Sequence, residues 1–206
     1  MVFPSKSMLA VETSLNSEIQ KISGLTYIPD FIEGNEQARL LEIIDQQQWS
    51  IKEQRRLQEY GYKYDFEKGS FVSSSYLGNL PDWIQSVAQR LFEDGLIANV
   101  PDQVIVNEYQ PGQGIVSHID CIPCFGNTII ILSLGSACVM SFTHSKTHEE
   151  VKILLQPGSL LISQEEARYS WWHGISASQK DDYKGQEVVR KRRISLTFRE
   201  VLFPYK

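Results

Sequence analysis

The chain contains 206 residues, 42% of them hydrophobic and 22% charged, a composition typical of a globular protein long enough to bury its own core. Its net charge of −5 argues against a protein that coats nucleic acid non-specifically, although an acidic body can still carry a local basic groove. Three cysteines are too few for the disulfide framework of a small secreted domain. No stretch reaches the ~20 apolar residues that cross a bilayer, and the first residues lack the pattern of a signal peptide. We therefore expect a soluble monomer with no membrane partner, located inside the cell, in the cytoplasm or, in a eukaryote, also in the nucleus.

The first half of the chain predicts an arm, a strand and two helices. Residues 1–20 are polar, rich in serine and weakly patterned, which indicates a flexible N-terminal arm before one domain at 21–206. A short strand is expected within "GLTYIPDFI". Apolar residues at helical spacing predict a helix over 34–48, and a second helix over 82–94 follows a proline and precedes a glycine.

Beyond residue 103 the pattern changes to short β-rich runs separated by Pro-Gly turns. The runs read "QVIVNEY", "NTIIILSLG", "ACVMSF", "VKILL", "LLIS" and "RRISLTFREVLF". Two helices followed by many short strands predict an α+β fold in which antiparallel sheets form a sandwich or a barrel.

A candidate metal site begins in "SHIDCIPCFG", where His118 and Asp120 stand two residues apart. Side chains at this spacing share one face of a strand, so both can reach one ion. His144 and His148 lie in a polar hairpin connection and are expected to be solvated. His173, within "ARYSWWHGI", is the better third ligand, although it could instead be a hydrogen-bonded, half-buried histidine. Two histidines and one carboxylate form the facial triad of non-haem iron(II) oxygenases.

The same stretch contains a Cys-x-x-Cys pair, Cys121 and Cys124. A structural zinc site needs four ligands, usually from a second such pair, and a thioredoxin-like motif needs a βαβ context. Neither is present in the sequence, so the two residues are expected to be ordinary loop thiols. Cys121 adjoins Asp120 and is expected to be prone to oxidation.

A candidate anion site lies in "RRISLTFREV", which alternates strictly between apolar and polar residues. One face carries Ile194, Leu196 and Phe198, and the other carries Arg193, Ser195, Thr197 and Arg199. The two arginines lie about 20 Å apart along an extended strand. Either this face is solvated, or the guanidinium groups lean inward and bracket a small dianion by pairing with its carboxylates.

These motifs together resemble the AlkB family of iron(II)- and 2-oxoglutarate-dependent dioxygenases. The resemblance covers about residues 54–201 and rests on N-x-Y, H-x-D, a distal histidine and R-x5-R in that order. "LSLGS" and "ARYSWWHGI" look closer to the branch that contains the tRNA wobble-uridine hydroxylase. The resemblance implies a double-stranded β-helix, or jelly roll, with N-terminal supporting helices. It also implies Fe(II) as the metal and 2-oxoglutarate and O2 as cosubstrates.

The resemblance also implies a role for each matching residue. His118, Asp120 and His173 would be the iron ligands and thus the catalytic centre. Arg193, helped by Ser195 and Tyr109, would pair with the distal carboxylate of 2-oxoglutarate. Asn107 and Arg199 would lie near the end of the cosubstrate that chelates iron, unless Arg199 braces the carboxylate ligand instead.

Residues 52–68, "KEQRRLQEYGYKYDFEK", mix aromatic and basic side chains as a single-stranded nucleic acid requires. The candidate contacts are Arg55, Arg56, Tyr60, Tyr62 and Tyr64. The alternative is a half-buried strand whose aromatics pack in the core. The resemblance favours contact, because this region matches the nucleotide-recognition lid, here about residues 52–80. The basic run "RKRR" at 190–193 could contact phosphate. The alternative is that its first three residues are solvated charges.

The implied reaction is oxidative demethylation or hydroxylation of modified bases in RNA or single-stranded DNA. Ile122 stands where the bacterial founder of the family carries a second acid, which weakens the inference to repair of methylated adenine or cytosine. Two alternatives stay open. One is a protein hydroxylase on the same scaffold, and the other is a catalytically silent jelly-roll binding module.

Overall fold

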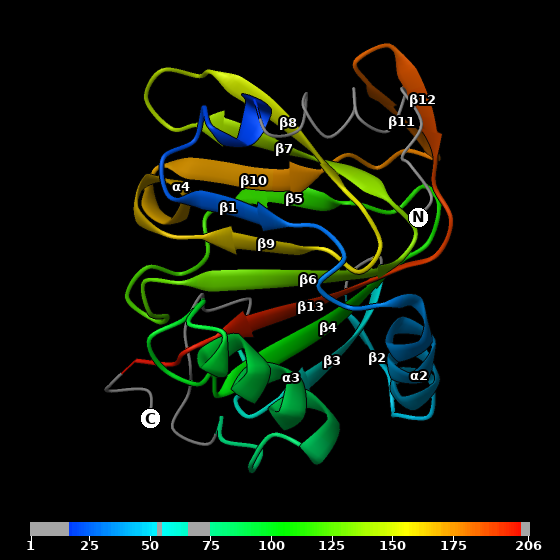
Figure 1. The fold of residues 1–206 in the computed structure, drawn as a ribbon, viewed down its shortest axis with the longest axis vertical. Helices are drawn as coiled ribbons and strands as arrows, with labels where there is room; N and C mark the ends of the chain where they lie inside the picture. The colour runs from blue at the N-terminus through cyan, green and yellow to red at the C-terminus, as the bar shows by residue number, and fades with distance from the viewer. Residues whose placement is uncertain (1–16, 53–54, 66–74, 203–206) are drawn as a thin grey trace, which may run out of the picture.

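The computed structural model describes residues 17–52, 55–65 and 75–202, and Figure 1 shows their arrangement. The elements are, in chain order, β1 (Leu25–Ile28), α2 (Gly34–Asp45), β2 (Ser50–Lys52), β3 (Arg55–Tyr60), α3 (Asp82–Glu93), β4 (Gln103–Tyr109), β5 (Ile115–His118), β6 (Ile129–Gly135), β7 (Cys138–His144), β8 (Glu150–Leu155), β9 (Leu160–Ser163), α4 (Glu165–Tyr169), β10 (Trp171–Ile175), β11 (Lys180–Tyr183), β12 (Gln186–Val189) and β13 (Arg193–Arg199). The predicted strand and both predicted helices are present, with the first helix ending three residues early.

Two antiparallel sheets form the jelly roll of the predicted α+β class. The major sheet has the strand order β1-β9-β6-β13-β4-β3-β2, and the minor sheet has the order β5-β10-β7-β8. The two sheets face each other (Figure 1), and a hydrophobic cluster fills the space between them. That cluster joins Tyr109 and Ile131 of the major sheet to Met140, Phe142 and Trp171 of the minor sheet.

The alternation of β13 decides which face of the major sheet is apolar. Ile194, Leu196 and Phe198 are fully buried on the outer face, where α2 and α3 cover them. Burying a side chain of this size stabilises the fold by about 1.5–3 kcal/mol. The polar residues of β13 therefore face inward, toward the minor sheet. This confirms the predicted division of the strand into two faces.

The last residues of the predicted arm are packed against the body. Ile19 contacts the cluster between the sheets, and Glu18 accepts from the Nζ atoms of Lys21 and Lys184, both at 2.8 Å. Residues 1–16 of the arm lie outside the described residues.

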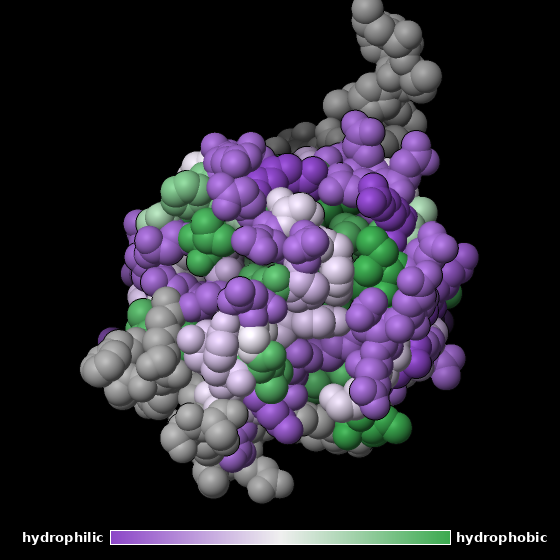
Figure 2. All heavy atoms as spheres, turned by 90° about the horizontal axis from the view of Figure 1, so that it is seen from below, coloured by the Kyte–Doolittle hydropathy of each residue, from purple (hydrophilic) through white to green (hydrophobic). Residues whose placement is uncertain are grey.

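The face of the molecule seen in Figure 2 presents mainly polar groups. In Figure 2 the coloured part of the face seen from below is largely hydrophilic, with hydrophobic residues in separate areas. Among residues 17–52, 55–65 and 75–202, no helix combines the length and the apolar character needed to span a membrane.

Candidate iron and 2-oxoglutarate site

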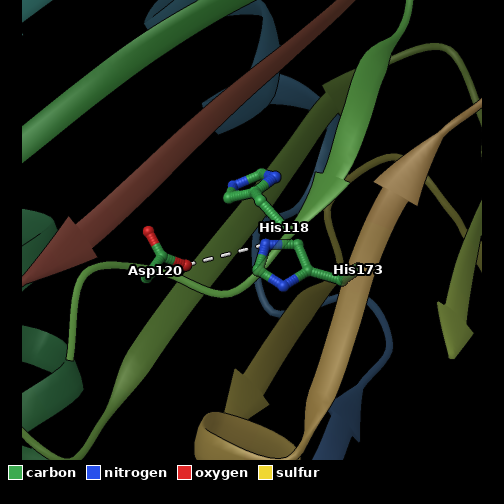
Figure 3. Close-up of side chains that lie close together, drawn as sticks. All are labelled: His118, Asp120 and His173. Carbon is green, nitrogen blue, oxygen red and sulfur yellow. Dashed lines mark ion pairs between the residues drawn. The ribbon is translucent and has the colours of Figure 1, made fainter. Parts of the chain in front are cut away.

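The three predicted metal ligands meet between the sheets (Figure 3). β5 and β10 pair so that His118 lies opposite His173, with ring centroids 4.6 Å apart. Asp120 follows two residues after the end of β5, and the ligand atoms of the three residues all lie within 4.8 Å of one another. His144, by contrast, accepts backbone N–H groups of its own turn through Nδ1, as expected of a histidine outside the site.

Strand alternation alone does not position Asp120, because β5 ends at His118. Instead, the Arg199 guanidinium lies 2.5 Å from Oδ1 of Asp120, and Arg168 donates to its main-chain oxygen at 2.8 Å. Burial by itself would raise the pKa of Asp120, but Arg199 and the two histidines hold that pKa well below its usual range. The carboxylate is therefore anionic at neutral pH.

The two histidines offer ring nitrogens as ligands for a metal. Burial lowers the pKa of His173 to about 4, against the opposing effect of Asp120, so its imidazole is uncharged at neutral pH. Nδ1 of His118 donates to the carbonyl of Val116 at 2.8 Å, so Nε2 is the ring nitrogen that could bind a metal. Two imidazoles and a carboxylate fit a divalent metal of the iron type.

The predicted anion site lies beside the triad on the inner face of β4, β6 and β13. Arg193 is 2% exposed, and its Nη2 donates to Oγ of Ser133 at 2.8 Å. Its Nε and Nη1 atoms have no partner among the residues that the structure describes. Tyr109, opposite Arg193 in the β4–β13 register, presents its ring 5.4 Å from the guanidinium carbon. A buried guanidinium with two unpaired nitrogens fits the distal carboxylate of 2-oxoglutarate.

The other predicted cosubstrate residues share this face. Ser195 pairs with Asn107 in the register, and both are buried. Arg199 contacts Asp120 and also donates to Oε1 of Gln103 at 3.2 Å. Of the two predicted roles for Arg199, bracing the carboxylate ligand is the one that the contacts favour.

Only part of the predicted substrate set faces the site. Arg55 does, because its Nε donates to Oδ1 of Asn107 at 3.1 Å. Arg56 lies on the opposite face of β3, with Nη2 2.8 Å from Glu108 and its guanidinium over Trp49. Tyr60 also points to the helix side, where its ring packs edge-on against Trp83 at 5.6 Å. Arg56 and Tyr60, predicted as nucleic-acid contacts, therefore lie on the face of β3 that points away from the site.

Tyr60, Tyr62 and Tyr64 stand at every second position of the sequence, but the alternation of β3 ends at Gly61, directly after the strand. Gly61 has φ +75°, and a Cβ there would lie 1.8 Å from the main-chain oxygen of Asp102. The chain turns, so Tyr62 and Tyr64 lie away from Tyr60 and pack with Phe125 near Asp120. The Tyr64 and Phe125 rings are 5.7 Å apart. Phe66 lies outside the described residues.

Arg190, the first residue of the basic run at 190–193, has a structural role. Arg190 is 6% exposed and holds both carboxylate oxygens of Asp181, as well as the carbonyl of Ser176 at 2.7 Å. Arg192 pairs with Glu108 and Asp45. Both predictions for Arg190, a phosphate contact or a solvated charge, are therefore wrong, because its guanidinium is buried and paired with Asp181.

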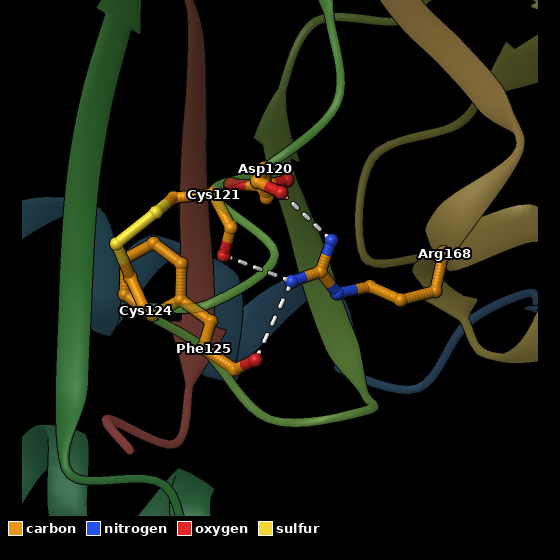
Figure 4. The surroundings of a disulfide bond; sticks show 5 residues. All are labelled: Asp120, Cys121, Cys124, Phe125 and Arg168. Carbon is orange, nitrogen blue, oxygen red and sulfur yellow. Dashed lines mark hydrogen bonds between the residues drawn. A yellow bond between two sulfur atoms is a disulfide. The ribbon is translucent and has the colours of Figure 1, made fainter. Parts of the chain in front are cut away.

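The two cysteines after Asp120 form a disulfide, not a pair of free thiols (Figure 4). The N–H groups of Cys124 and Phe125 both donate to the carbonyl of Cys121, which closes a single turn. This turn brings the two Cα atoms to 5.3 Å, within the range that a disulfide spans. The spacing alone does not reveal the turn, so the prediction of ordinary loop thiols is wrong.

Sequence reasoning missed Ser133, the partner of Arg193, and Arg168, the partner of the loop after Asp120. Both lie in motifs that support the resemblance, "LSLGS" and "ARYSWWHGI", but neither motif indicates by its spacing what these two side chains contact.

A cavity of about 520 Å³ adjoins the site. Its lining includes Ser117 and Gly174, the chain neighbours of His118 and His173, together with Arg55. The remaining lining residues come from β5, β7, β10 and the segments next to them: Gly114, Ile115, Val116, Ser141, Thr143, Ile175, Ser176 and Ala177. The cavity therefore borders the chain neighbours of two candidate ligands, and the ligands themselves are not among the lining residues that the structure describes.

We expect Gly174→Ala to disturb the metal site. A Cβ at Gly174 would lie 2.8 Å from Cα of Ser117 and 2.9 Å from its nitrogen, so β5 must move and carry His118 with it. The free energy of unfolding should fall by ~1–3 kcal/mol, and the affinity for Co(II) should fall ~10-fold. Urea denaturation and Co(II) titration measure both. Gly34→Ala, whose Cβ would meet nothing within 4 Å, is the control and should leave the Co(II) affinity unchanged without lowering the free energy of unfolding.

Comparison with known proteins agrees with this geometry. The family model of the 2OG-Fe(II) oxygenase superfamily matches residues 24–199. The chain is 34% identical over 203 residues to tRNA (carboxymethyluridine(34)-5-O)-methyltransferase ALKBH8 of Mus musculus, covering 86% of this chain but only 30% of that protein. It is 29% identical to the probable RNA/DNA demethylase ALKBH6 of Danio rerio, covering 85% and 84%.

A solved structure shares the fold. The structure of OsALKBH1 superimposes with a TM-score of 0.64 at 16% identity, covering 86% of this chain and 98% of the other. The chain therefore belongs to the 2OG-Fe(II) oxygenase superfamily and is an oxygenase of the AlkB type that uses Fe(II) and 2-oxoglutarate.

Proposed function

We propose that the protein oxidatively demethylates or hydroxylates modified bases in RNA or single-stranded DNA. The observation that carries this proposal is the lining of the cavity beside the triad. Four hydroxyl side chains and the Arg55 guanidinium line it, with no carboxylate among the lining residues that the structure describes, on a chain whose net charge is −5. Hydroxyl and guanidinium groups are the usual contacts to phosphate and sugar, whereas a carboxylate would repel the anionic phosphate.

The proposed roles follow the geometry of the site. His118, Asp120 and His173 would hold Fe(II), which supplies the activation of O2 when bound. Arg193, with Ser133 and Tyr109 beside it, would hold the distal carboxylate of 2-oxoglutarate, while Asn107 and Ser195 line the same buried face. Arg199 would keep Asp120 charged and in place. These groups bind and orient, and the burial of the site between two sheets limits access of water.

The substrate must reach this site as an extruded or unpaired base, because the atoms to be oxidised in a duplex lie inside the stack. Tyr62 and Tyr64, half-buried near Asp120, offer aromatic faces on the side of the disulfide loop. Ile122, 48% exposed, offers an apolar contact where the family founder carries an acid. The relative from Mus musculus is named for tRNA, which supports RNA as the first class to test.

A second candidate is a protein hydroxylase on the same scaffold. It is favoured by the positions of Arg56 and Tyr60, which point away from the site and remove two of the five predicted nucleic-acid contacts. Peptides therefore belong in the same assay.

The test is nucleoside mass spectrometry on total tRNA mixed with single-stranded methylated DNA. The pool receives protein, Fe(II), ascorbate and 2-oxoglutarate, and Asp120→Ala is the inactive control. We expect one nucleoside to lose a methyl group or gain an oxygen with the active protein only. An unchanged pool, with 2-oxoglutarate consumption that rises on adding peptides, would contradict the proposal and establish the protein hydroxylase.

A further inference from the structure

We propose that Cys121 and Cys124 form a redox couple that controls how tightly the site holds its metal. The disulfide form holds the carboxylate ligand in place, and the dithiol form releases the loop that carries it. The inference rests on the proposed role of Asp120 as an iron ligand. Neither cysteine takes part in the proposed chemistry itself.

The disulfide closes the turn directly after the carboxylate ligand. Cys121 adjoins Asp120 in the chain, and Cys124 is fully buried in a cluster with Phe125 and Val201. The turn is tied to the C-terminal segment, because N–H of Leu202 donates to the carbonyl of Cys124 at 2.9 Å. The covalent ring therefore anchors one end of the loop in a buried cluster and the other end at the ligand.

Arg168 couples this loop to the rest of the metal site (Figure 4). Its guanidinium is 2% exposed and donates to the carbonyls of Asp120 at 2.8 Å, Cys121 at 3.2 Å, Phe125 at 3.5 Å and Gly126 at 3.2 Å. The four oxygens converge on one planar group only while the turn keeps its present shape. Arg168 lies on α4, immediately before the strand β10 that carries a histidine ligand, so it joins two of the three ligand segments.

A second contact links the turn to the carboxylate through side chains. The ring of Phe125 lies under the Arg199 guanidinium, 4.8 Å from its carbon, and the same guanidinium lies 2.5 Å from Oδ1 of Asp120. A shift of the turn therefore displaces both the main chain of Asp120 and the cation that orients its carboxylate. Removing groups that orient metal ligands in this way typically costs 10–100-fold in metal affinity.

The reduction needs a dithiol. One thiolate of the reductant attacks Sγ of Cys121, which is half-buried, whereas Cys124 is fully enclosed. The S–S bond breaks, and Cys124 leaves as a thiolate that takes up a proton. The second thiol of the reductant then displaces Cys121 as a thiol. The protein gains two electrons and two protons, and the reductant becomes a cyclic disulfide.

The test compares Co(II) binding by the two forms, because Co(II) is a redox-stable substitute for Fe(II) with a visible spectrum. The disulfide form is verified by its intact mass. The dithiol form is made with dithiothreitol under anaerobic conditions and then desalted. We expect the dissociation constant for Co(II) to be ~10-fold larger for the dithiol form, with the same increase in the variant Cys121→Ser/Cys124→Ser. Thermal melting of each sample verifies that it is folded.

Cys138→Ala is the matched control, because it removes the third cysteine, buried on β7, and keeps the disulfide. Its response to dithiothreitol should equal that of the wild type. Equal affinities of the two wild-type forms would overturn the inference and leave the ligand proposal standing. Binding by neither form would overturn both. In the oxidised protein, Arg168→Lys should weaken Co(II) binding and remove most of the redox response. The reason is that the disulfide and Arg168 act on the metal site through the carbonyls of the same loop.

Discussion

Replacing Arg193 by methionine should weaken 2-oxoglutarate binding ~100-fold, because it removes charge-assisted hydrogen bonds of ~1.5–3 kcal/mol. The same replacement should make the ligand-free protein more stable. Methionine fills a similar space without a buried charge, and Nε and Nη1 of Arg193 have no partner to lose within residues 17–52, 55–65 and 75–202. The free energy of unfolding should rise by about 1 kcal/mol. Titration of the Co(II)-loaded protein with 2-oxoglutarate and urea denaturation of the ligand-free protein measure the two effects.

Arg190→Met makes the same chemical change at another buried arginine and should move stability in the opposite direction. Arg190 is paired with Asp181, so its loss leaves a buried carboxylate without a counter-charge. The expected loss is ~3–5 kcal/mol in the free energy of unfolding. If Arg193→Met destabilises the protein as much as Arg190→Met does, Arg193 is a structural residue and its assignment to the cosubstrate is wrong.

Asp120→Asn should weaken Co(II) binding by more than ~100-fold, because it removes the only anionic donor of the three candidate ligands. It should also lower the free energy of unfolding by ~3 kcal/mol, since Arg199 keeps its charge but loses its carboxylate partner. Asp45→Asn is the matched control. Asp45 pairs with Arg192 at the surface, where an ion pair contributes less than ~1 kcal/mol. Retention of full Co(II) affinity by Asp120→Asn would place the metal elsewhere.

The same variant has a pH signature. The pKa of Asp120 is lowered in the folded protein, so its contribution to stability is complete above the unfolded-state pKa near ~4 and is lost as the pH falls below it. Urea denaturation of the metal-free protein between neutral and acidic pH should therefore show a smaller loss of stability in Asp120→Asn than in the wild type. Equal losses would mean that the Arg199–Asp120 pair does not stabilise the fold.

Local chemistry is what the sequence by itself determined. The alternation of β13 indicated one apolar and one polar face because side chains in a strand alternate whatever the strand packs against. The order N-x-Y, H-x-D, distal histidine and R-x5-R indicated the family for a similar reason, since each motif is short and its residues act within one strand or turn. The spacing of His118 and Asp120 suggested a pair, but Asp120 lies beyond the end of β5 and is held by Arg199 and Arg168.

Only the tertiary structure decided which charges are paired and which aromatics face the site. Arg56 meets Glu108 on β4, Arg190 meets Asp181 on β11, and Arg168 meets the loop after Asp120, all through contacts between segments separated in the chain. The turn at Gly61 sends Tyr60 into the helix-side core and Tyr62 toward Phe125. A single basic or aromatic residue looks the same in the sequence whether it packs inside the fold or contacts a substrate. The free energy that decides its position comes from the partner that folding brings to it.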